Sequence, residues 1–180
     1  MIIKRQTDID LVRSCQRQDR LAQKELYDRY KNAMYTLIYR ITNDFALSEE
    51  VLQDAFVKVF KHIGNFRGEA SIGSWIKTIV TRTALEKVRN KIVFEPFDTT
   101  LREEVIDWGH HLDADYLERA IQNLSEGYRS VFVLIEIEGY SHKEVATLLG
   151  ISVGTSKSQL YHAKRKLKSQ LLDLKKFLNE

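Results

Sequence analysis

The chain has 180 residues, of which 43% are hydrophobic, 29% charged and 10% aromatic, which is enough apolar material for one ordinary domain or two small ones. A single Cys excludes an internal disulfide framework and a Cys-based zinc site, and it is consistent with a reducing cytoplasm. No apolar run reaches the roughly 18 residues of a membrane span, and the first residues carry no secretory leader. We therefore expect a cytoplasmic protein without membrane insertion.

The net charge of +3 is unevenly distributed along the chain. Residues 1–92 carry 17 Lys/Arg and 11 Asp/Glu, residues 93–150 carry 4 and 12, and residues 151–180 carry 7 and 2, which gives +6, −8 and +5. Basic segments of this kind are typical of contact with phosphate groups. A solvated Lys/Arg face has the same composition, so charge alone leaves both possibilities open.

Apolar residues recur at helical spacing through most of the chain, so we expect an all-α fold. The predicted helices span residues 8–17, 20–41, 46–63, 75–91, 113–124, 126–138, 142–149 and 153–172. The polar side of helix 46–63 consists of Ser48, Gln53, Asp54, Lys58, Lys61 and His62. The run Val-Phe-Val-Leu-Ile at 131–135 also has strand propensity, but the Gly139 that follows it favours a buried helix.

Two segments between the predicted helices lack this spacing. Residues 64–74 contain three Gly and two Ser, which predicts a loop. Phe66 in this segment and Trp75 just after it could stack on unpaired bases, although aromatic residues more often belong to a core. Residues 93–112 hold the only Pro, Pro96, and five acidic residues, which predicts a flexible acidic linker, with an ordered loop as the alternative.

Residues 141–168 have the pattern of a helix-turn-helix. Ser141 and Glu144 match a capping box, Gly150 ends the short helix that this box begins, and a basic helix follows. On a helical wheel, the side of the basic helix expected to face the core carries Ser156, Leu160, Ala163, Leu167 and Leu171. The opposite side carries Ser158, His162, Arg165 and Ser169, flanked by Lys157, Tyr161 and Lys164. Donors and cations on that side suit contact with base edges and phosphates in a major groove.

Several segments together resemble one known family. In the first half they are ALSEEVLQDAFVKVF (46–60), FRGEAS (66–71) and WIKTI (75–79). In the second half they are LSEGYR (124–129), EGYSHKEVA (138–146) and LGISVGTSKSQL (149–160). In this order they resemble the sigma-70 family of bacterial RNA polymerase sigma factors, extracytoplasmic-function (ECF) group, and the resemblance covers nearly the whole chain.

The resemblance implies a role for each segment. Contact with a coiled coil of the largest polymerase subunit would involve Gln53, Asp54 and Lys58. Capture of an extruded base and contact with the −10 element would involve Asn65, Phe66, Arg67, Gly68, Glu69, Ala70, Ser71, Lys77, Thr78 and Arg82. Contact with the −35 element as duplex would involve Thr155, Lys157, Ser158, Tyr161, His162 and Arg165.

The same resemblance implies the domain organisation and the partners. We expect a sigma region 2-like domain over 1–92, a linker over 93–112 and a sigma region 4-like, winged-helix-like helix-turn-helix domain over 113–180. The implied partners are core RNA polymerase, promoter DNA and an anti-sigma factor. No metal or cofactor is expected, and without a nucleotide-binding, serine-hydrolase or zinc-protease motif we expect a binding protein rather than an enzyme. The lone Cys15 is expected to be structural.

Three residues depart from the family pattern. Arg82 stands where many relatives have Asn, Lys87 stands near the position of an aromatic residue, and His162 stands where relatives often have Arg. Neutral His is a weaker phosphate partner than Arg.

Two other interpretations of the sequence remain open. One is a transcription regulator that binds duplex operator DNA through its helix-turn-helix and needs no polymerase. The other is an interaction protein whose basic faces bind an acidic partner.

Overall fold

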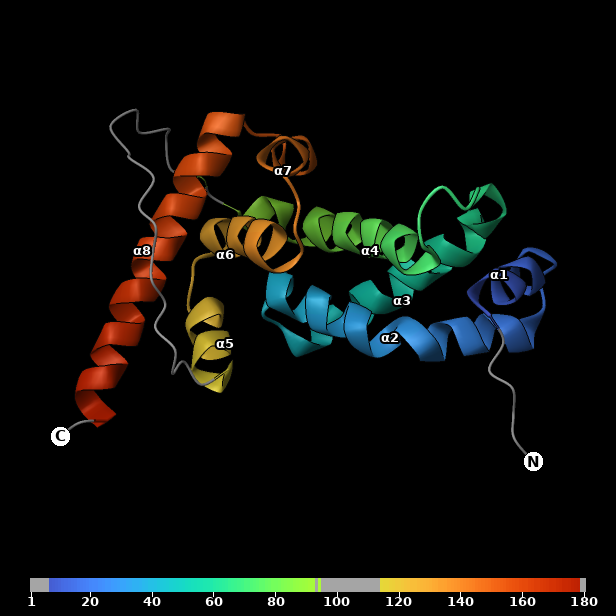
Figure 1. The fold of residues 1–180 in the computed structure, drawn as a ribbon, viewed down its shortest axis with the longest axis horizontal. Coiled ribbons are helices and arrows are strands. Elements are labelled where there is room, and N and C mark those ends of the chain that lie inside the picture. The colour runs from blue at the N-terminus through green and yellow to red at the C-terminus, as the bar shows by residue number, and fades with distance from the viewer. Residues whose placement is uncertain (1–6, 93, 95–113, 179–180) are drawn as a thin grey trace. The chain divides into compact units, whose positions relative to one another are not determined.

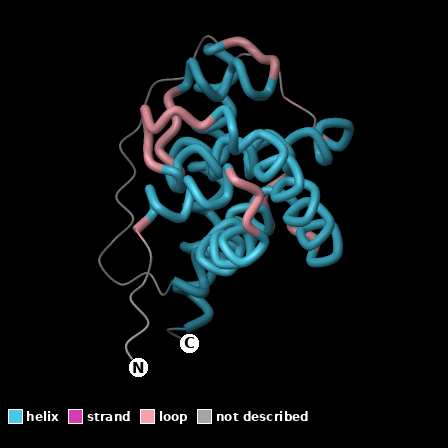
Figure 2. Tube along the Cα trace, turned by 90° about the vertical axis from the view of Figure 1, so that its right-hand side faces the viewer, coloured by secondary structure: helices cyan, strands magenta, loops and turns pink. Residues whose placement is uncertain are grey.

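A computed structural model describes residues 7–92, 94 and 114–178 of the chain. Every element in these residues is helical (Figure 2), so the predicted all-α fold class is confirmed. The chain divides into two compact units, Met1–Lys87 (unit 1) and Val88–Glu180 (unit 2). The predicted acidic linker, residues 93–112, lies outside the described residues except for Phe94. In the described parts of both units, no helix is long and apolar enough to cross a membrane.

The described part of unit 1, from residue 7 on, contains four α-helices and a 3₁₀ turn (Figure 1). They are α1 (Asp8–Gln16), α2 (Arg20–Thr42), α3 (Phe45–His62), η1 (Ile63–Asn65) and α4 (Ile72–Val88). The side chains of Thr7, Asp19 and Asp44 accept hydrogen bonds from backbone N–H groups in the first turns of α1, α2 and α3. These caps explain why the first three helices begin within a residue of their predicted starts.

Helix α4 begins before the predicted residue 75. The hydroxyl of Ser71 accepts a hydrogen bond from the backbone N–H of Ser74 at 3.1 Å, which caps the helix at Ile72. The loop predicted over 64–74 is therefore confined to residues 66–71, and a short 3₁₀ helix, η2 (Arg89–Lys91), follows α4.

The core of unit 1 lies between α2, α3 and α4. Its fully buried apolar side chains include Leu26, Ile38, Ile41, Val51, Val59, Ile76 and Val80. Ser48 was predicted on the polar side of its helix, but it is also fully buried. Its hydroxyl donates to the carbonyl of Asp44 at 2.6 Å and contacts the hydroxyl of Thr42 at 2.8 Å. Burial costs little here because these bonds replace the water that the hydroxyl loses.

In unit 2, helices α5, α6 and α7 pack against the long helix α8. The elements are α5 (Ala114–Gln122), α6 (Glu126–Phe132), η3 (Val133–Ile137), α7 (His142–Leu149) and α8 (Val153–Leu178). Residues 131–135 are helical rather than extended, as predicted, but from Val133 the helix widens to a π-helical turn. Gly139, with φ 76°, follows this turn in a left-handed conformation that suits glycine.

Candidate nucleic-acid and polymerase interfaces

The helix-turn-helix of unit 2 is held together by polar contacts at its turn. The capping box is confirmed, because Ser141 and Glu144 exchange hydrogen bonds between side chain and backbone in both directions. Gly150 ends α7 with φ 68°. The Ser152 hydroxyl accepts from the Thr155 N–H at 2.9 Å, and Nδ1 of His142 lies 2.9 Å from the hydroxyl of Ser156. This last contact joins the first residue of α7 to the first turn of α8, which restrains the angle between the two helices.

Helix α8 presents the basic face that the helical wheel predicts, with one exception. The five residues expected to face the core, Ser156, Leu160, Ala163, Leu167 and Leu171, are all buried. On the other side Lys157 and Arg165 are exposed, whereas Thr155, Tyr161 and His162 are half-buried. The guanidinium of Arg165 lies 5.7 Å from the ring centre of Tyr161, which itself meets the His162 ring edge-on at 5.5 Å.

Ser158 is the exception. The wheel places it on the outward side, but only 2% of its surface is exposed. Its hydroxyl turns back and donates to the carbonyl of Thr155 at 3.0 Å. A wheel records the angle of a side chain and not its length, so it does not show that a short hydroxyl can be satisfied by its own helix. The exposure predicted for Ser158 is therefore wrong.

The loop 66–71 of unit 1 borders a cavity of about 700 Å³. Loop residues form one wall, and the other wall comes from α1, through Asp8, Ile9, Val12, Arg13 and Gln16, with Ile72 adjoining. Gly68 has φ 77°, a left-handed conformation that lets the loop turn sharply beside the cavity. Phe66 and Trp75 are half-buried and meet edge-on, with ring centres 5.6 Å apart. The loop therefore borders a hollow large enough for a nucleobase, and its aromatic rings are partly accessible.

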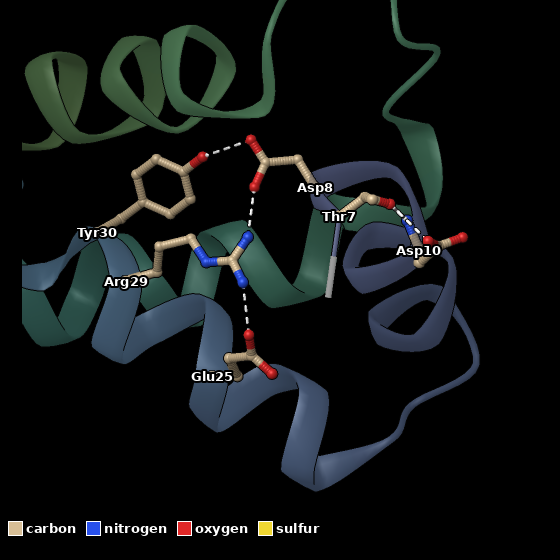
Figure 3. Close-up of polar contacts among 6 residues, drawn as sticks. All are labelled: Thr7, Asp8, Asp10, Glu25, Arg29 and Tyr30. Carbon is tan, nitrogen blue, oxygen red and sulfur yellow. Dashed lines mark hydrogen bonds and ion pairs between the residues drawn. The ribbon is translucent and has the colours of Figure 1, made fainter. Parts of the chain in front are cut away.

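Helix α1 is tied both to this loop and to α2. The amide of Gln16 donates to the carbonyl of Ile63 at 3.1 Å and to that of Phe66 at 3.5 Å. Arg29 on α2 donates to Asp8 at 2.6 Å and pairs with Glu25, and the hydroxyl of Tyr30 donates to Asp8 at 3.2 Å (Figure 3). Burial, together with the Asp8 carboxylate, raises the pKa of Tyr30.

The residues predicted on the helix after the loop differ in exposure. Arg82 is exposed, while Lys77 and Thr78 are half-buried. The hydroxyl of Thr78 donates to the carbonyl of Ser74 at 3.0 Å. Asn65 at the end of η1 and the loop residues Arg67, Gly68, Glu69, Ala70 and Ser71 are exposed.

The residues predicted to bind polymerase lie on α3, beside ion pairs to α4. Gln53 and Asp54 are exposed, and Lys58 is half-buried. Lys87 lies 2.5 Å from Glu50 and 3.1 Å from Asp54, and the hydrogen bonds that it donates to these two carboxylates raise its pKa. Lys58 lies 2.9 Å from Glu86 and 3.2 Å from the hydroxyl of Thr83. Two of the three predicted residues are thus oriented by partners on α4.

Family models match both units. The model described as Sigma-70 region 2 matches residues 26–91, and the model described as Sigma-70, region 4 matches residues 114–167. The RNA polymerase sigma-H factor of Pseudomonas aeruginosa is 30% identical over 96% of this chain and 98% of its own length. The chain belongs to the sigma-70 family, ECF group. The ECF RNA polymerase sigma-E factor of Haemophilus influenzae is also 30% identical to this sigma factor, over 93% of this chain and 97% of its own length.

Two solved structures share the fold of this sigma factor. CnrH, solved in complex with the cytosolic domain of CnrY, has a TM-score of 0.53 at 24% identity and covers 93% of this chain and 97% of its own. The sigma factor RpoE of Bartonella quintana, solved in complex with the anti-sigma factor NepR, has a TM-score of 0.52 at 21% identity, covering 82% and 95%.

Sequence reasoning missed the α1 wall of the cavity. Asp8, Arg13 and Gln16 lie some fifty residues before the loop that they face, as in the Gln16–Phe66 pair at a separation of 50. Helical periodicity carries no information about such a long-range contact. No local signal points to this wall, since the i,i+4 ion pair of Glu25 and Arg29 lies within α2.

Proposed function

We propose that this sigma factor divides promoter recognition between its two units, with unit 2 reading the −35 element and unit 1 melting and holding the −10 element on core RNA polymerase. The observation that carries the proposal is the helix-turn-helix, whose second helix is buried along one side and presents exposed cations along the other. The protein acts by binding in the cytoplasm, and the polymerase supplies the chemistry.

For the −35 element, we assign the contacts to the accessible side chains of α8. Lys157 and Arg165 are exposed cations that suit phosphates or guanine, and Thr155, Tyr161 and His162 add donors and aromatic surface. Ser158 is left out of this set because its hydroxyl is buried against its own helix.

For the −10 element, we assign base capture to the loop 65–71 and its cavity. Half-buried Phe66 and Trp75 offer aromatic surface for stacking, and Lys77, Thr78 and Arg82 follow on α4 for the adjoining strand. Extruding a base from duplex DNA costs a few kcal/mol, which binding in such a pocket offsets.

For the polymerase, we assign docking to the exposed side of α3 around Gln53 and Asp54, with Lys58 beside them. An anti-sigma factor is a further proposed partner, because the sigma factor RpoE of Bartonella quintana is bound to one in its solved structure. Such a partner would act by covering these docking and DNA-binding surfaces.

Reconstitution with sigma-free core polymerase from the host tests the proposal. We expect specific run-off transcription from host promoters with the wild-type chain. Asp54→Arg should abolish it by weakening core binding, and Lys157→Glu should reduce it about ten-fold while core binding is kept. Lys168→Glu, which makes the same charge change at another exposed position of α8, is the matched control and should remain active.

A different set of results would favour the regulator interpretation. If the folded chain forms no complex with core polymerase but shifts a palindromic duplex as a dimer, it acts as a stand-alone regulator. The proposed assignment of α3 to polymerase would then be wrong.

A further inference from the structure

The cavity beside the loop 66–71 has a second wall, made by α1. We propose that Arg13 on this wall contacts the edge of the extruded base, so that the first helix as well as the loop determines base preference in the −10 element. This inference rests on the proposed function of the loop as the site of base capture.

The cavity has the chemical character that a nucleobase requires. Apolar side chains of Val12, Ile72 and Phe66 line it, which suits the flat faces of a base. Charged side chains from both walls also line it, namely Arg13 and Asp8 from α1 and Arg67 and Glu69 from the loop. Base edges carry donors and acceptors that such groups recognise.

The two charged side chains on the α1 wall, Asp8 and Arg13, differ in whether they already have hydrogen-bond partners. Asp8 is engaged by Arg29 at 2.6 Å and by the Tyr30 hydroxyl at 3.2 Å (Figure 3). Arg13 is exposed, and among the residues that the structure describes its side chain has no hydrogen-bond or ion-pair partner. Arg13 is therefore the α1 group that can bind a ligand without first breaking a contact.

Asp8 and Gln16 act as positioning residues for Arg13. The Asp8 contacts attach the start of α1 to α2, through an Arg29 side chain that is only 14% exposed. Gln16 attaches the end of α1 to the carbonyls of Ile63 and Phe66, at the start of the loop. Arg13 lies between these two attachments on a rigid helix, and such a support holds a binding group more precisely than a loop does.

The geometry of the Arg13 guanidinium determines which bases it can recognise. Its planar fork donates to two neighbouring acceptors, which guanine offers at O6 and N7 and cytosine offers at O2 and N3. Adenine presents an acceptor beside a donor instead of two neighbouring acceptors, so it is a poorer match for the guanidinium. We therefore expect Arg13 to favour guanine or cytosine at one position of the −10 element.

The test uses holoenzyme assembled from the full chain and host core polymerase. A host promoter that it transcribes is randomised across the −10 region, and sequencing of the transcribed templates gives the base preference at each position. We expect Arg13→Ala to reduce the guanine or cytosine preference roughly ten-fold at one position only. Arg17→Ala, which removes the same charge from an exposed residue one turn on that does not line the cavity, should leave all preferences unchanged.

Arg13→Lys separates base reading from simple charge. Lys keeps the cation but lacks the fork, so the preference should fall as it does in Arg13→Ala. If Arg13→Lys keeps the preference, or if Arg13→Ala weakens initiation equally for all bases, Arg13 contacts phosphate and the inference is overturned. Gln16→Ala should weaken the base preference at the same position. In a chain that already carries Gln16→Ala, adding Arg13→Ala should remove the preference that remains.

The loop variant Phe66→Ala distinguishes failure of the proposed base capture by the loop from failure of the proposed role of Arg13 on α1. If Phe66→Ala leaves preferences across the −10 region intact, the proposed base capture by the loop is wrong. If Phe66→Ala removes a preference that Arg13→Ala leaves untouched, base capture stands and the role of α1 alone is rejected.

Discussion

Cys15 illustrates how burial controls the chemistry of a single residue. It is fully buried on α1, and burial, together with the carboxylates of Asp19 and Glu25, raises the pKa of its thiol from 9.0 to about 11. Since the folded pKa is the higher one, the thiol leaves stability unaffected below pH 9.0 and lowers it as the pH rises toward 11. At pH 8 we expect native Cys15 to react with iodoacetamide at least about 100-fold more slowly than in denaturant.

Mass spectrometry measures this rate without ambiguity, because the chain has one cysteine. Far-UV circular dichroism on the labelled sample provides the control for unfolding. Fast labelling at pH 8 of a chain that keeps its helical signal would show that the thiol is accessible and contradict the prediction.

Residue-level placement from sequence was reliable for apolar side chains and mixed for serine, since Ser156 was correctly placed on the core side. All five wheel residues of α8 on the core side are buried, because burying apolar surface dominates the orientation of a helix. Ser48 and Ser158 were both placed outside and are both buried. Their hydroxyls are satisfied by nearby carbonyls, which a hydrophobic pattern does not represent.

At the scale of one element, the start of α7 depends on the ionised form of Glu144. Hydrogen bonds from the Ser141 side chain and backbone lower the pKa of this carboxyl. A folded pKa below the unfolded one stabilises the fold at neutral pH, and this contribution is lost as the pH falls through the folded pKa. We expect Glu144→Gln to lower the thermal midpoint slightly at pH 7, because Gln can replace Glu in a capping box but lacks its charge.

Thermal melting of the full chain by circular dichroism, repeated at decreasing pH, checks this expectation. The difference between wild type and Glu144→Gln should shrink as the wild-type carboxyl becomes protonated. A difference that stays constant from pH 7 down to strongly acidic pH would mean that the charge of Glu144 contributes nothing to the cap.

Helix α8 allows a comparison of two lysines with different surroundings. Lys157 is exposed, whereas Lys164 lies 2.8 Å from Glu136 and has a side chain that is 25% exposed. If Lys157 contacts a DNA phosphate, Lys157→Ala should reduce the slope of log affinity against log salt by about 0.9 for holoenzyme on promoter duplex. Lys164→Ala is the control and should leave the slope unchanged, and equal slopes for all three proteins would exclude a phosphate contact at Lys157.

Elements were predicted well where both ends carry a local signal. The capping box and Gly150 delimit α7 in the sequence, and the structure has both. The π-helical turn at Val133–Ile137 and the early start of α4 were not predicted. A π turn has no sequence signature of its own, and the Ser71 cap that starts α4 lies within a Gly/Ser-rich stretch that favours a loop.

At the scale of the whole molecule, the proposed function gives each unit its own binding surface. Each unit has its own buried core, and each is matched by a different sigma-70 family model. Two modest contacts on one chain reinforce each other, because binding of the first raises the effective concentration of the second. The cavity belongs to unit 1 and helix α8 to unit 2, so the two proposed surfaces can be tested independently.

Combining a substitution in the protein with changes in the promoter tests whether the two units recognise separate promoter elements. In the proposed arrangement Lys157 contributes only through the −35 element, so Lys157→Glu should reduce initiation by about ten-fold on an intact promoter. If Lys157 also contacts a base of the −35 element, mutant and wild type should differ by less than about two-fold on a promoter with a scrambled −35 element, where that base contact is already lost. Scrambling the −10 element instead should leave the ten-fold effect of Lys157→Glu in place. If the substitution is equally harmful on the promoter with the scrambled −35 element, Lys157 contacts phosphate alone or acts elsewhere, and unit 2 does not read the bases of that element through this residue.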